Sequence, residues 1–261
     1  MEIRSRRGDD FRLASVRIGD ALSMGEDDFR RATETAYETL AAEMSGQDSF
    51  ALVRMWNFLP RILEPLGGHP HRYMVFNEGR WQAFVRLYGS PAEMALRVPT
   101  ASGVGHHGTA LVVHALGARE PGQVVENPRQ LEAYRYSSRY GPRPPCFARA
   151  TRLRHLAAPW LLVGGTASVV GEDAVYADDV EGQLEETIRN LESLVGENTR
   201  RPASLRVYYV RREDKGLLER RTRALFDAGD VEFVFADLCR SELLVEIEAL
   251  YRNGEHDAPS A

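Results

Sequence analysis

The chain has 261 residues, of which 43% are hydrophobic and 27% charged, and its formal net charge at pH 7 is −5. This length suits one large domain or two small ones, and the hydrophobic content is too high for a disordered chain. An acidic net charge without a polybasic segment gives no reason to expect nucleic acid or an anionic membrane surface as a partner.

The sequence shows no sign of secretion or membrane insertion. Residues 1–20 are charged and lack the apolar core of a signal peptide. The longest apolar run, residues 157–163, is much shorter than the about 18 residues of a membrane span. Two cysteines, Cys146 and Cys239, cannot form a disulfide scaffold. We therefore expect a cytoplasmic protein with reduced thiols.

The N-terminal part of the sequence predicts a mixture of helices and strands. Residues 27–44 carry apolar side chains at helical spacing after an acidic start, which predicts an amphipathic helix. Residues 77–88 predict a second helix, and residues 50–58 and 109–118 predict strands. The glycine-rich segment 101–108 is expected to be a loop.

Residues 121–145 differ in character from the rest of the chain. They contain five prolines, four arginines and three tyrosines, and they show neither a helical nor a strand period. A segment of this length without regular structure is usually functional or disordered. The tyrosines favour order, because aromatic rings ordinarily seek burial. We expect an ordered loop that joins two halves of the chain.

The C-terminal part predicts the element order ββαβαββ. Helices are expected at residues 178–195, where Gly196 follows as a C-cap, and at residues 215–228. Strands are expected at residues 147–156, 159–163, 204–210, 231–235 and 243–251. This order indicates an α+β half with helices packed on one face of a mixed sheet. The composition of residues 253–261 predicts a disordered tail.

The sequence contains no standard metal or nucleotide motif. Its seven histidines and two cysteines lack zinc-binding spacing. The glycines at 103, 105, 164 and 165 match neither the dinucleotide nor the P-loop pattern. They suit tight turns and close backbone packing, or backbone N–H groups that face a carboxylate. Ser168 lies in no nucleophile-elbow pattern and is interpreted as a bystander.

The loop at 121–145 is the first feature that could carry chemistry. In it, four arginines alternate with three tyrosines: Arg129, Tyr134, Arg135, Tyr136, Arg139, Tyr140 and Arg143. Guanidinium groups bind carboxylates in a bidentate manner, and tyrosines add neutral donors beside an apolar ring. This mixture suits a small, dianionic, partly apolar ligand. The alternative is a loop held by arginine hydrogen bonds to its own carbonyl groups.

The last predicted strand places two glutamates on one face. In the sequence VEIEA, Glu246 and Glu248 alternate with Val245 and Ile247, which face the other side. Two such glutamates are commonly exposed on an edge strand. A glutamate that instead faces a cleft lined by arginine and tyrosine would be a candidate acid.

Several stretches together resemble the chorismatase family. They are RMWNFLP (54–60), RYMVFNEGRWQAF (72–84), TASGVGHHG (100–108), ENPRQLEAYRYSSRYGPRPPCFARA (126–150), GGTASVVGED (164–173) and ADLCRSELLVEIEA (236–249). The resemblance implies an α+β fold of two RidA/YjgF-like (chorismate-mutase-like) halves. These are a degenerate half at residues 1–145 with the Arg/Tyr-rich substrate loop, and a catalytic half at residues 146–252. Because family members are longer at the N-terminus, the N-terminal half is expected to be shortened and to lack its first strands.

The resemblance also implies an enzyme that cleaves the enolpyruvyl ether of chorismate and releases pyruvate, without a metal or organic cofactor. Glu246 corresponds to the family's acid, and it would protonate the terminal CH₂ of the enol ether if burial keeps its proton in place. The other expected site residues stand in matching motifs. They are Arg129, Arg149 and Arg80 for the carboxylates, Tyr134 and Tyr140 for the ring, and Gly165, Thr166 and Ala167 for the pyruvyl end.

The expected product depends on Cys239, which lies seven residues before Glu246. A cysteine at this distance resembles the one that distinguishes hydroxybenzoate-forming members of the family. The resemblance therefore implies 3-hydroxybenzoate as the main product, for secondary metabolism. The alternatives are a packing role for Cys239 as a small buried side chain, 3,4-dihydroxycyclohexa-1,5-diene carboxylate as the product, imine deamination, or a non-catalytic protein that binds small carboxylates. The sequence leaves open whether the protein is a monomer or a trimer.

Overall fold

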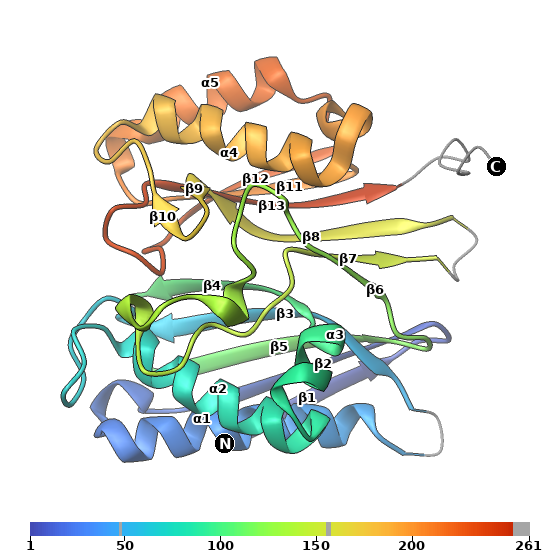
Figure 1. Cartoon of the computed structure of the whole chain (residues 1–261), viewed down its shortest axis with the longest axis vertical. Coiled ribbons are helices and arrows are strands. Elements are labelled where there is room, and N and C mark those ends of the chain that lie inside the picture. Colours follow the sequence, from blue (N-terminus) through green and yellow to red (C-terminus); the bar gives the residue numbers. More distant parts are fainter. Residues whose placement is uncertain (47–48, 155–157, 253–261) are drawn as a thin grey trace.

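The computed structural model describes residues 1–46, 49–154 and 158–252. The predicted tail at 253–261 and part of the strand expected at 147–156 lie outside these residues. The molecule has four layers (Figure 1): two sheets face each other in the middle, and each sheet carries helices on its outer face. The α+β fold of two halves is therefore confirmed.

The N-terminal half contains a five-stranded sheet with the order β1-β2-β5-β3-β4. Its strands are β1 (Glu2–Arg7), β2 (Phe11–Ile18), β3 (Ala51–Pro60), β4 (Thr100–His106) and β5 (Leu111–Ala118), and its helices are α1 (Glu26–Met44), α2 (Arg72–Tyr88) and α3 (Pro91–Arg97). The expectation that this half lacks its first strands is wrong, because β1 and β2 form a hairpin and β2 pairs with β5. Every residue of β1 is exposed, so the sequence carries no burial pattern there.

Strand β4 also corrects the sequence analysis, which expected a loop at 101–108. This strand pairs in parallel with β3, and its Gly105 allows close contact with the C-terminal half. A Cβ atom at Gly105 would lie 2.4 Å from Cγ2 of Ile62 in the same half and 3.0 Å from Cβ of Asp237 in the C-terminal half. The Gly105 N–H donates to the carbonyl of Asp237 at 2.7 Å. The glycines here are needed for close packing rather than for a turn.

The C-terminal half contains a six-stranded sheet with the order β12-β11-β13-β8-β7-β6. Its strands are β6 (Gln123–Val125), β7 (Ala150–Leu153), β8 (Trp160–Ala167), β11 (Ser204–Tyr209), β12 (Asp230–Phe235) and β13 (Val245–Arg252), and its helices are α4 (Val180–Val195) and α5 (Lys215–Leu225). A small hairpin of β9 (Val169–Val170) and β10 (Asp173–Ala174) follows β8. From β7 onward the order of the main elements is ββαβαββ, as the sequence predicts.

The ends of α4 show why the sequence predicts this helix well. The side chain of Asp179 accepts a hydrogen bond from the Gly182 N–H at the N-cap, and Gly196 adopts a φ of 79° at the C-cap. Between these caps, Leu184, Ile188 and Leu191 pack against the sheet. The apolar spacing and the C-cap expected at Gly196 therefore agree with the structure.

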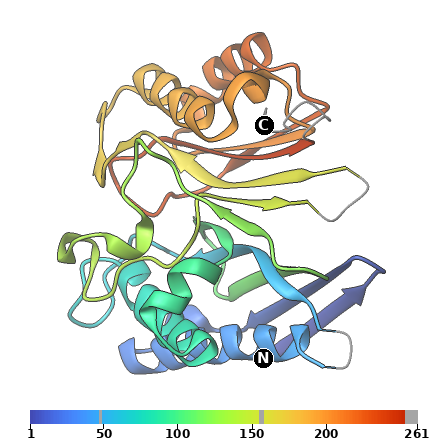
Figure 2. The same cartoon turned by 45° about the vertical axis from the view of Figure 1, so that its right-hand side comes forward.

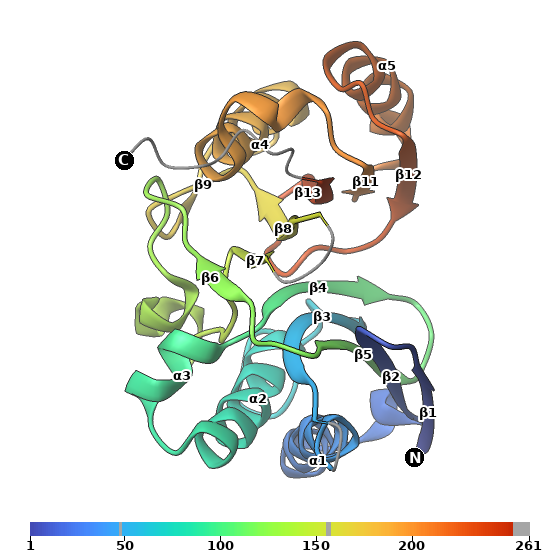
Figure 3. The ribbon, with the colours of Figure 1, turned by 90° about the vertical axis from the view of Figure 1, so that its right-hand side faces the viewer.

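The two sheets are joined by an apolar layer and by the chain itself. Val53 and Ala118 from the N-terminal half pack against Leu153 and Leu162 from the C-terminal half. The segment between β6 and β7 passes alongside both halves (Figures 2 and 3). It contains the predicted ordered loop, with short 3₁₀ turns at Ala133–Arg135 and Ser138–Tyr140.

Candidate active site

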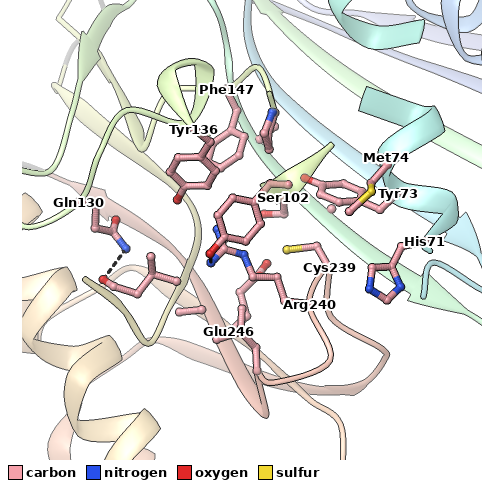
Figure 4. Close-up of a pocket in the computed structure, with 18 of the residues that line it drawn as sticks. His71, Tyr73, Met74, Ser102, Gln130, Tyr136, Phe147, Cys239, Arg240 and Glu246 are labelled. Carbon is pink, nitrogen blue, oxygen red and sulfur yellow. Dashed lines mark hydrogen bonds between the residues drawn. The ribbon is translucent and has the colours of Figure 1, made fainter. Parts of the chain in front are cut away.

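A pocket between the two halves gathers most of the charged groups that sequence analysis had singled out (Figure 4). Its walls come from β4 and α2 of the N-terminal half, from β8 and β13 of the C-terminal half, and from the connecting loop. Glu246, Cys239, Arg80, Arg149, Tyr140, Gly165 and Ala167 all line it. The fold thus brings together seven of the ten expected site residues.

Glu246 lies on β13, which is a central strand between β11 and β8. Both Glu246 and Glu248 face the interior between the sheets and are buried, so the alternative of two exposed edge-strand glutamates is wrong. Val245 and Ile247 point to the other side and join the core beneath α4. The predicted division of the two faces is confirmed.

Glu246 is suited to hold a proton at neutral pH. Its Oε1 atom is buried and has no hydrogen-bond partner. Burial, together with the charge of Glu248, raises the pKa of Glu246 to about 8, although Arg54 and Arg149 act in the opposite direction. A neutral carboxylic acid therefore faces the pocket.

A β-bulge makes room for this carboxyl group. Between the pairs Ile247–Thr166 and Ala249–Val163 the register shifts, so that Gly164 and Gly165 of β8 lie opposite the single residue Glu248 of β13. A Cβ atom at Gly165 would lie 2.0 Å from Oε1 of Glu246, and one at Gly164 would lie 2.7 Å from the carbonyl oxygen of Ala101. The two glycines therefore serve close approach, one to the acid and one to the opposite half.

Three arginines of the pocket are not paired with any carboxylate of the described residues. Within the described parts of the chain, Arg80, Arg149 and Arg240 form no salt bridge, in contrast to Arg54, Arg129 and Arg206. Arg80 is 1% exposed and donates to Asn77 Oδ1 at 2.7 Å, while its Nε is buried without a partner. Uncompensated buried cations attract an anionic ligand.

The other two pocket arginines are oriented by tyrosines. Arg149 donates to the hydroxyl of Tyr136 at 2.6 Å and to the carbonyl of Leu131 at 2.9 Å. Arg240 lies over the ring of Tyr140, 3.9 Å from its centroid, and donates to its hydroxyl at 3.1 Å. These contacts hold the guanidinium groups in place without forming a salt bridge to a carboxylate among the described residues.

Cys239 contributes a neutral thiol. Figure 4 shows its sulfur pointing into the pocket. Burial raises the pKa of the Cys239 thiol to about 12, and the negative charge of an ionised Glu246 would act in the same direction. The group is therefore a thiol at neutral pH rather than a nucleophilic thiolate.

Three expected site residues do not line this pocket. Arg129 donates to Asn190 Oδ1 at 2.9 Å and forms a salt bridge with Glu186, which ties the loop to α4. Tyr134 packs against the core of the N-terminal half. The hydroxyl of Thr166 donates to the carbonyl of Gly164 at 3.1 Å.

The structure divides the Arg/Tyr-rich loop between the two interpretations left open by its sequence. Arg129 and Arg135 pair with carboxylates of the protein, and Arg143 lies over the ring of Trp81. Tyr136 and Tyr140 line the pocket. Part of the loop is therefore held by internal contacts, and part faces the ligand space.

Several pocket residues were missed by the sequence analysis. The most important are Arg240, Tyr136, Gln130, Tyr73, Phe147 and Ser102. Arg240 directly follows Cys239, and Tyr136 lies in the Arg/Tyr-rich loop that the sequence analysis already considered as a ligand-binding segment. Their positions in the sequence could therefore have suggested both residues. Ser102 was missed because its segment was taken for a loop. Tyr73 and Phe147 look like ordinary core residues in sequence.

The described residues contain no group of three or more His, Cys, Asp or Glu side chains arranged to hold a metal ion. Among the same residues, no helix has the length and apolar character needed to cross a membrane.

Comparison with known proteins gives consistent matches. A family model described as chorismatase FkbO/Hyg5-like, N-terminal, matches residues 1–117. A protein of Streptomyces hygroscopicus named 3-hydroxybenzoate synthase is 32% identical over 240 residues, which are 85% of this chain and 69% of that protein. A chorismatase of Streptomyces rapamycinicus is 35% identical over 216 residues, which are 77% of this chain and 64% of that protein. The chain thus spans about two thirds of the length of these relatives.

A solved structure agrees over nearly the whole chain. The crystal structure of a chorismatase aligns with a TM-score of 0.85 and 30% sequence identity. The alignment covers 95% of this chain and 77% of the chorismatase chain. A smaller protein, TdcF of E. coli with bound serine, aligns with 51% of this chain at 16% identity and a TM-score of 0.38.

Proposed function

This chain belongs to the chorismatase family, and from that premise we propose that it releases pyruvate from chorismate by acid-assisted cleavage of the enolpyruvyl ether, with 3-hydroxybenzoate as the main product. The observation that carries the proposal is the pairing, in one pocket, of a protonated glutamate with three arginines that lack carboxylate partners. One group supplies the proton and the others bind a dianion.

Substrate binding follows from the charges. Chorismate carries two carboxylates, one on the ring and one on the enolpyruvyl group. Arg80, Arg149 and Arg240 offer charge-assisted hydrogen bonds to them, and such bonds are stronger than neutral ones. The rings of Tyr136, Tyr140 and Phe147 supply an apolar wall for the cyclohexadiene. Arg129 and Tyr134 are not required for this mode of binding.

The chemistry begins with a proton. An enol ether is activated when its terminal CH₂ group takes a proton, because the adjacent carbon then becomes an oxocarbenium ion stabilised by the ether oxygen. We assign this proton to Glu246, whose raised pKa keeps it available at neutral pH. The backbone at Gly165 and Ala167 lies beside Glu246 and lines the same part of the pocket.

Product identity depends on the C4 hydroxyl of the ring. Water attack alone cleaves the ether and leaves both ring oxygens, which gives 3,4-dihydroxycyclohexa-1,5-diene carboxylate. For 3-hydroxybenzoate, the C3 oxygen displaces the C4 hydroxyl as water and bridges C3 and C4 as an epoxide. The new C4–O bond then breaks, and loss of the proton on C3 makes the ring aromatic. The water released equals the water consumed, so chorismate divides into pyruvate and 3-hydroxybenzoate with no change in overall composition and no need for a redox cofactor. We assign Cys239, a neutral thiol in the pocket, to the control of this branch.

The proposal is tested by incubating the protein with chorismate, with and without EDTA. Pyruvate, 3-hydroxybenzoate and 3,4-dihydroxycyclohexa-1,5-diene carboxylate are then measured. The proposal predicts pyruvate and 3-hydroxybenzoate in equal amounts, with no effect of EDTA. Pyruvate no faster than the spontaneous rate, with chorismate still bound in calorimetry, would instead indicate a small-carboxylate binding protein of the same family. Turnover of imines without turnover of chorismate would indicate a deaminase.

A further inference from the structure

The second glutamate of β13 lies in a cluster of its own. Glu246 and Glu248 share one face of the strand, where residues two apart are separated by roughly 7 Å. Glu246 lines the active-site pocket, whereas Glu248 lines a separate cavity together with Arg54, Trp56 and Arg206. The two glutamates thus face two different cavities.

Both oxygens of Glu248 are occupied by hydrogen-bond donors. Oε2 accepts from Arg54 Nη2 at 2.5 Å and from the hydroxyl of Ser102 at 2.6 Å. Oε1 accepts from Arg206 Nη1 at 2.7 Å and from Trp56 Nε1 at 3.3 Å. Four donors, two of them guanidinium groups, are the environment of an ionised carboxylate. In contrast, Oε1 of Glu246 has no partner.

Arg54 is the cation on which the contrast between the two glutamates depends. It lies on β3, is 3% exposed, and acts electrostatically on both Glu246 and Glu248. Its Nη2 is fixed by Glu248 and Ser102, and its Nη1 donates to the carbonyl of Met55. A buried arginine without its carboxylate partner is costly. If Glu248 lost its charge, Arg54 would therefore favour ionisation of the next carboxyl group, which is that of Glu246.

Other titratable and charged side chains also act on the pKa of Glu246, and they remain in place when Glu248 is replaced. They are Tyr73 and Arg80 on α2, Arg149 before β7, Tyr208 on β11, and Cys239, Arg240 and Glu242 before β13. Among these, the arginines favour an ionised Glu246. Burial of Glu246 opposes these arginines, and Glu248, the anion fixed on the same strand, acts in the same direction as burial.

We propose that Glu248 is a positioning residue of the active site: by pairing with Arg54 and by placing a fixed negative charge on β13, it keeps the catalytic proton on Glu246. Its catalytic consequence rests on the proposed function, but the location of the proton does not. Glu248 itself does not line the active-site pocket and transfers no proton.

The test is a titration of Glu246 in variants that fold. With ¹³C-labelled glutamate, the carboxyl signal of Glu246 is identified by its loss in Glu246→Gln, and its midpoint is followed with pH. In Glu248→Gln the midpoint should fall by about one pH unit or more, because the repulsion is lost and Arg54 is released. The matched control is Glu232→Gln, which removes an exposed carboxylate that contacts Arg206 and should leave the midpoint in place.

A second variant should shift the titration midpoint of Glu246 in the opposite direction. In Arg54→Met the anion of Glu248 remains without its main cation, so the Glu246 midpoint should rise. Circular dichroism checks that each variant is folded, and if one of the two fails to fold, the other decides. An unmoved Glu246 midpoint in either folded variant would overturn the proposal.

The titration needs no chorismate, so the two proposals fail separately. If the midpoint moves as expected but the native protein releases no pyruvate, the role of Glu248 stands and the proposed function falls. If the native protein turns chorismate over but the midpoint in Glu248→Gln stays in place, the inference falls and the function stands. If both hold, the alkaline limb of kcat in Glu248→Gln should move to lower pH together with the midpoint.

Discussion

The carboxyl group of Glu246 lies against Gly165, so closely that a methyl group on residue 165 would approach Oε1 to 2.0 Å. The bulge that creates this space is formed by two consecutive glycines with different neighbours. This difference permits a paired experiment.

Gly165→Ala should impair turnover and leave the fold intact. The new methyl group meets the end of a flexible side chain, so Glu246 rotates away, and misplacement by about 1 Å can reduce turnover by about 10²-fold. Gly164→Ala should instead lower stability, because its methyl group meets the backbone carbonyl of Ala101. Thermal denaturation and chorismate kinetics on both variants test this contrast. Equal effects of the two on kcat and on Tm would contradict it.

Replacement of the acid itself should separate chemistry from binding. Glu246→Gln keeps the shape but removes the transferable proton, so kcat should fall by about 10²-fold or more, while the Kd for chorismate changes little. Isothermal titration with chorismate and a pyruvate assay supply the two readings. A variant that retains most of the native turnover would show that another group donates the proton.

The activity should depend on pH through the same group. Because burial and the charge of Glu248 raise the pKa of Glu246 to about 8, the acid form is present at pH 7 and is lost as the pH rises through 8. We expect kcat to be level near neutrality and to decline about tenfold per pH unit above that value. A profile that rises through pH 8 would assign Glu246 the opposite role, that of a base.

Folding stability should follow the same proton. An unfolded glutamate ionises near 4.5, whereas folded Glu246 keeps its proton up to about 8. Between these values the folded state binds more protons than the unfolded state, so this contribution to stability is complete below pH 4.5 and is lost as the pH rises through 8. The difference in free energy of unfolding between the native protein and Glu246→Gln should shrink over this interval. A difference that is independent of pH would contradict the shift.

Replacing an arginine that has a carboxylate partner should have a different effect from replacing one that has none. Arg80→Met removes a cation that has no carboxylate partner, so we expect a KM increase of about tenfold or more from the lost charge-assisted bond. The loss of its hydrogen bond to buried Asn77 should lower stability by about 1–3 kcal/mol. Arg129→Met breaks the salt bridge to Glu186 and should act mainly on stability. Comparison of KM and Tm for the two variants checks this. A larger KM effect at Arg129 would restore the role that its sequence motif suggested.

These arginines also show the limit of sequence analysis. Whether an arginine binds ligand depends on which carboxylates lie near it in space, and the pairing of Arg129 with Glu186 on α4 leaves no trace in local spacing. Helices α1 and α4 were predictable because one apolar face is buried along their whole length. Strand β1 was not, because it is exposed on both faces. Glu246 could be identified only by resemblance, since its burial depends on β13 lying between two other strands.

Cys239→Ala should change the product rather than the rate of ether cleavage. The thiol is neutral and lies in the pocket with Glu246, so its removal should raise the proportion of 3,4-dihydroxycyclohexa-1,5-diene carboxylate at the expense of 3-hydroxybenzoate. Chromatography against both standards measures the ratio, and Cys146→Ala is the matched control because that cysteine does not line the pocket. An unchanged ratio would reduce Cys239 to a packing residue.

The most direct test of the account is the product balance of the native protein and Glu246→Gln, measured side by side on chorismate. The account predicts one pyruvate and one 3-hydroxybenzoate for each chorismate consumed by the native protein, and the loss of both products in the variant. Pyruvate formation by the native protein at no more than the spontaneous rate would contradict it.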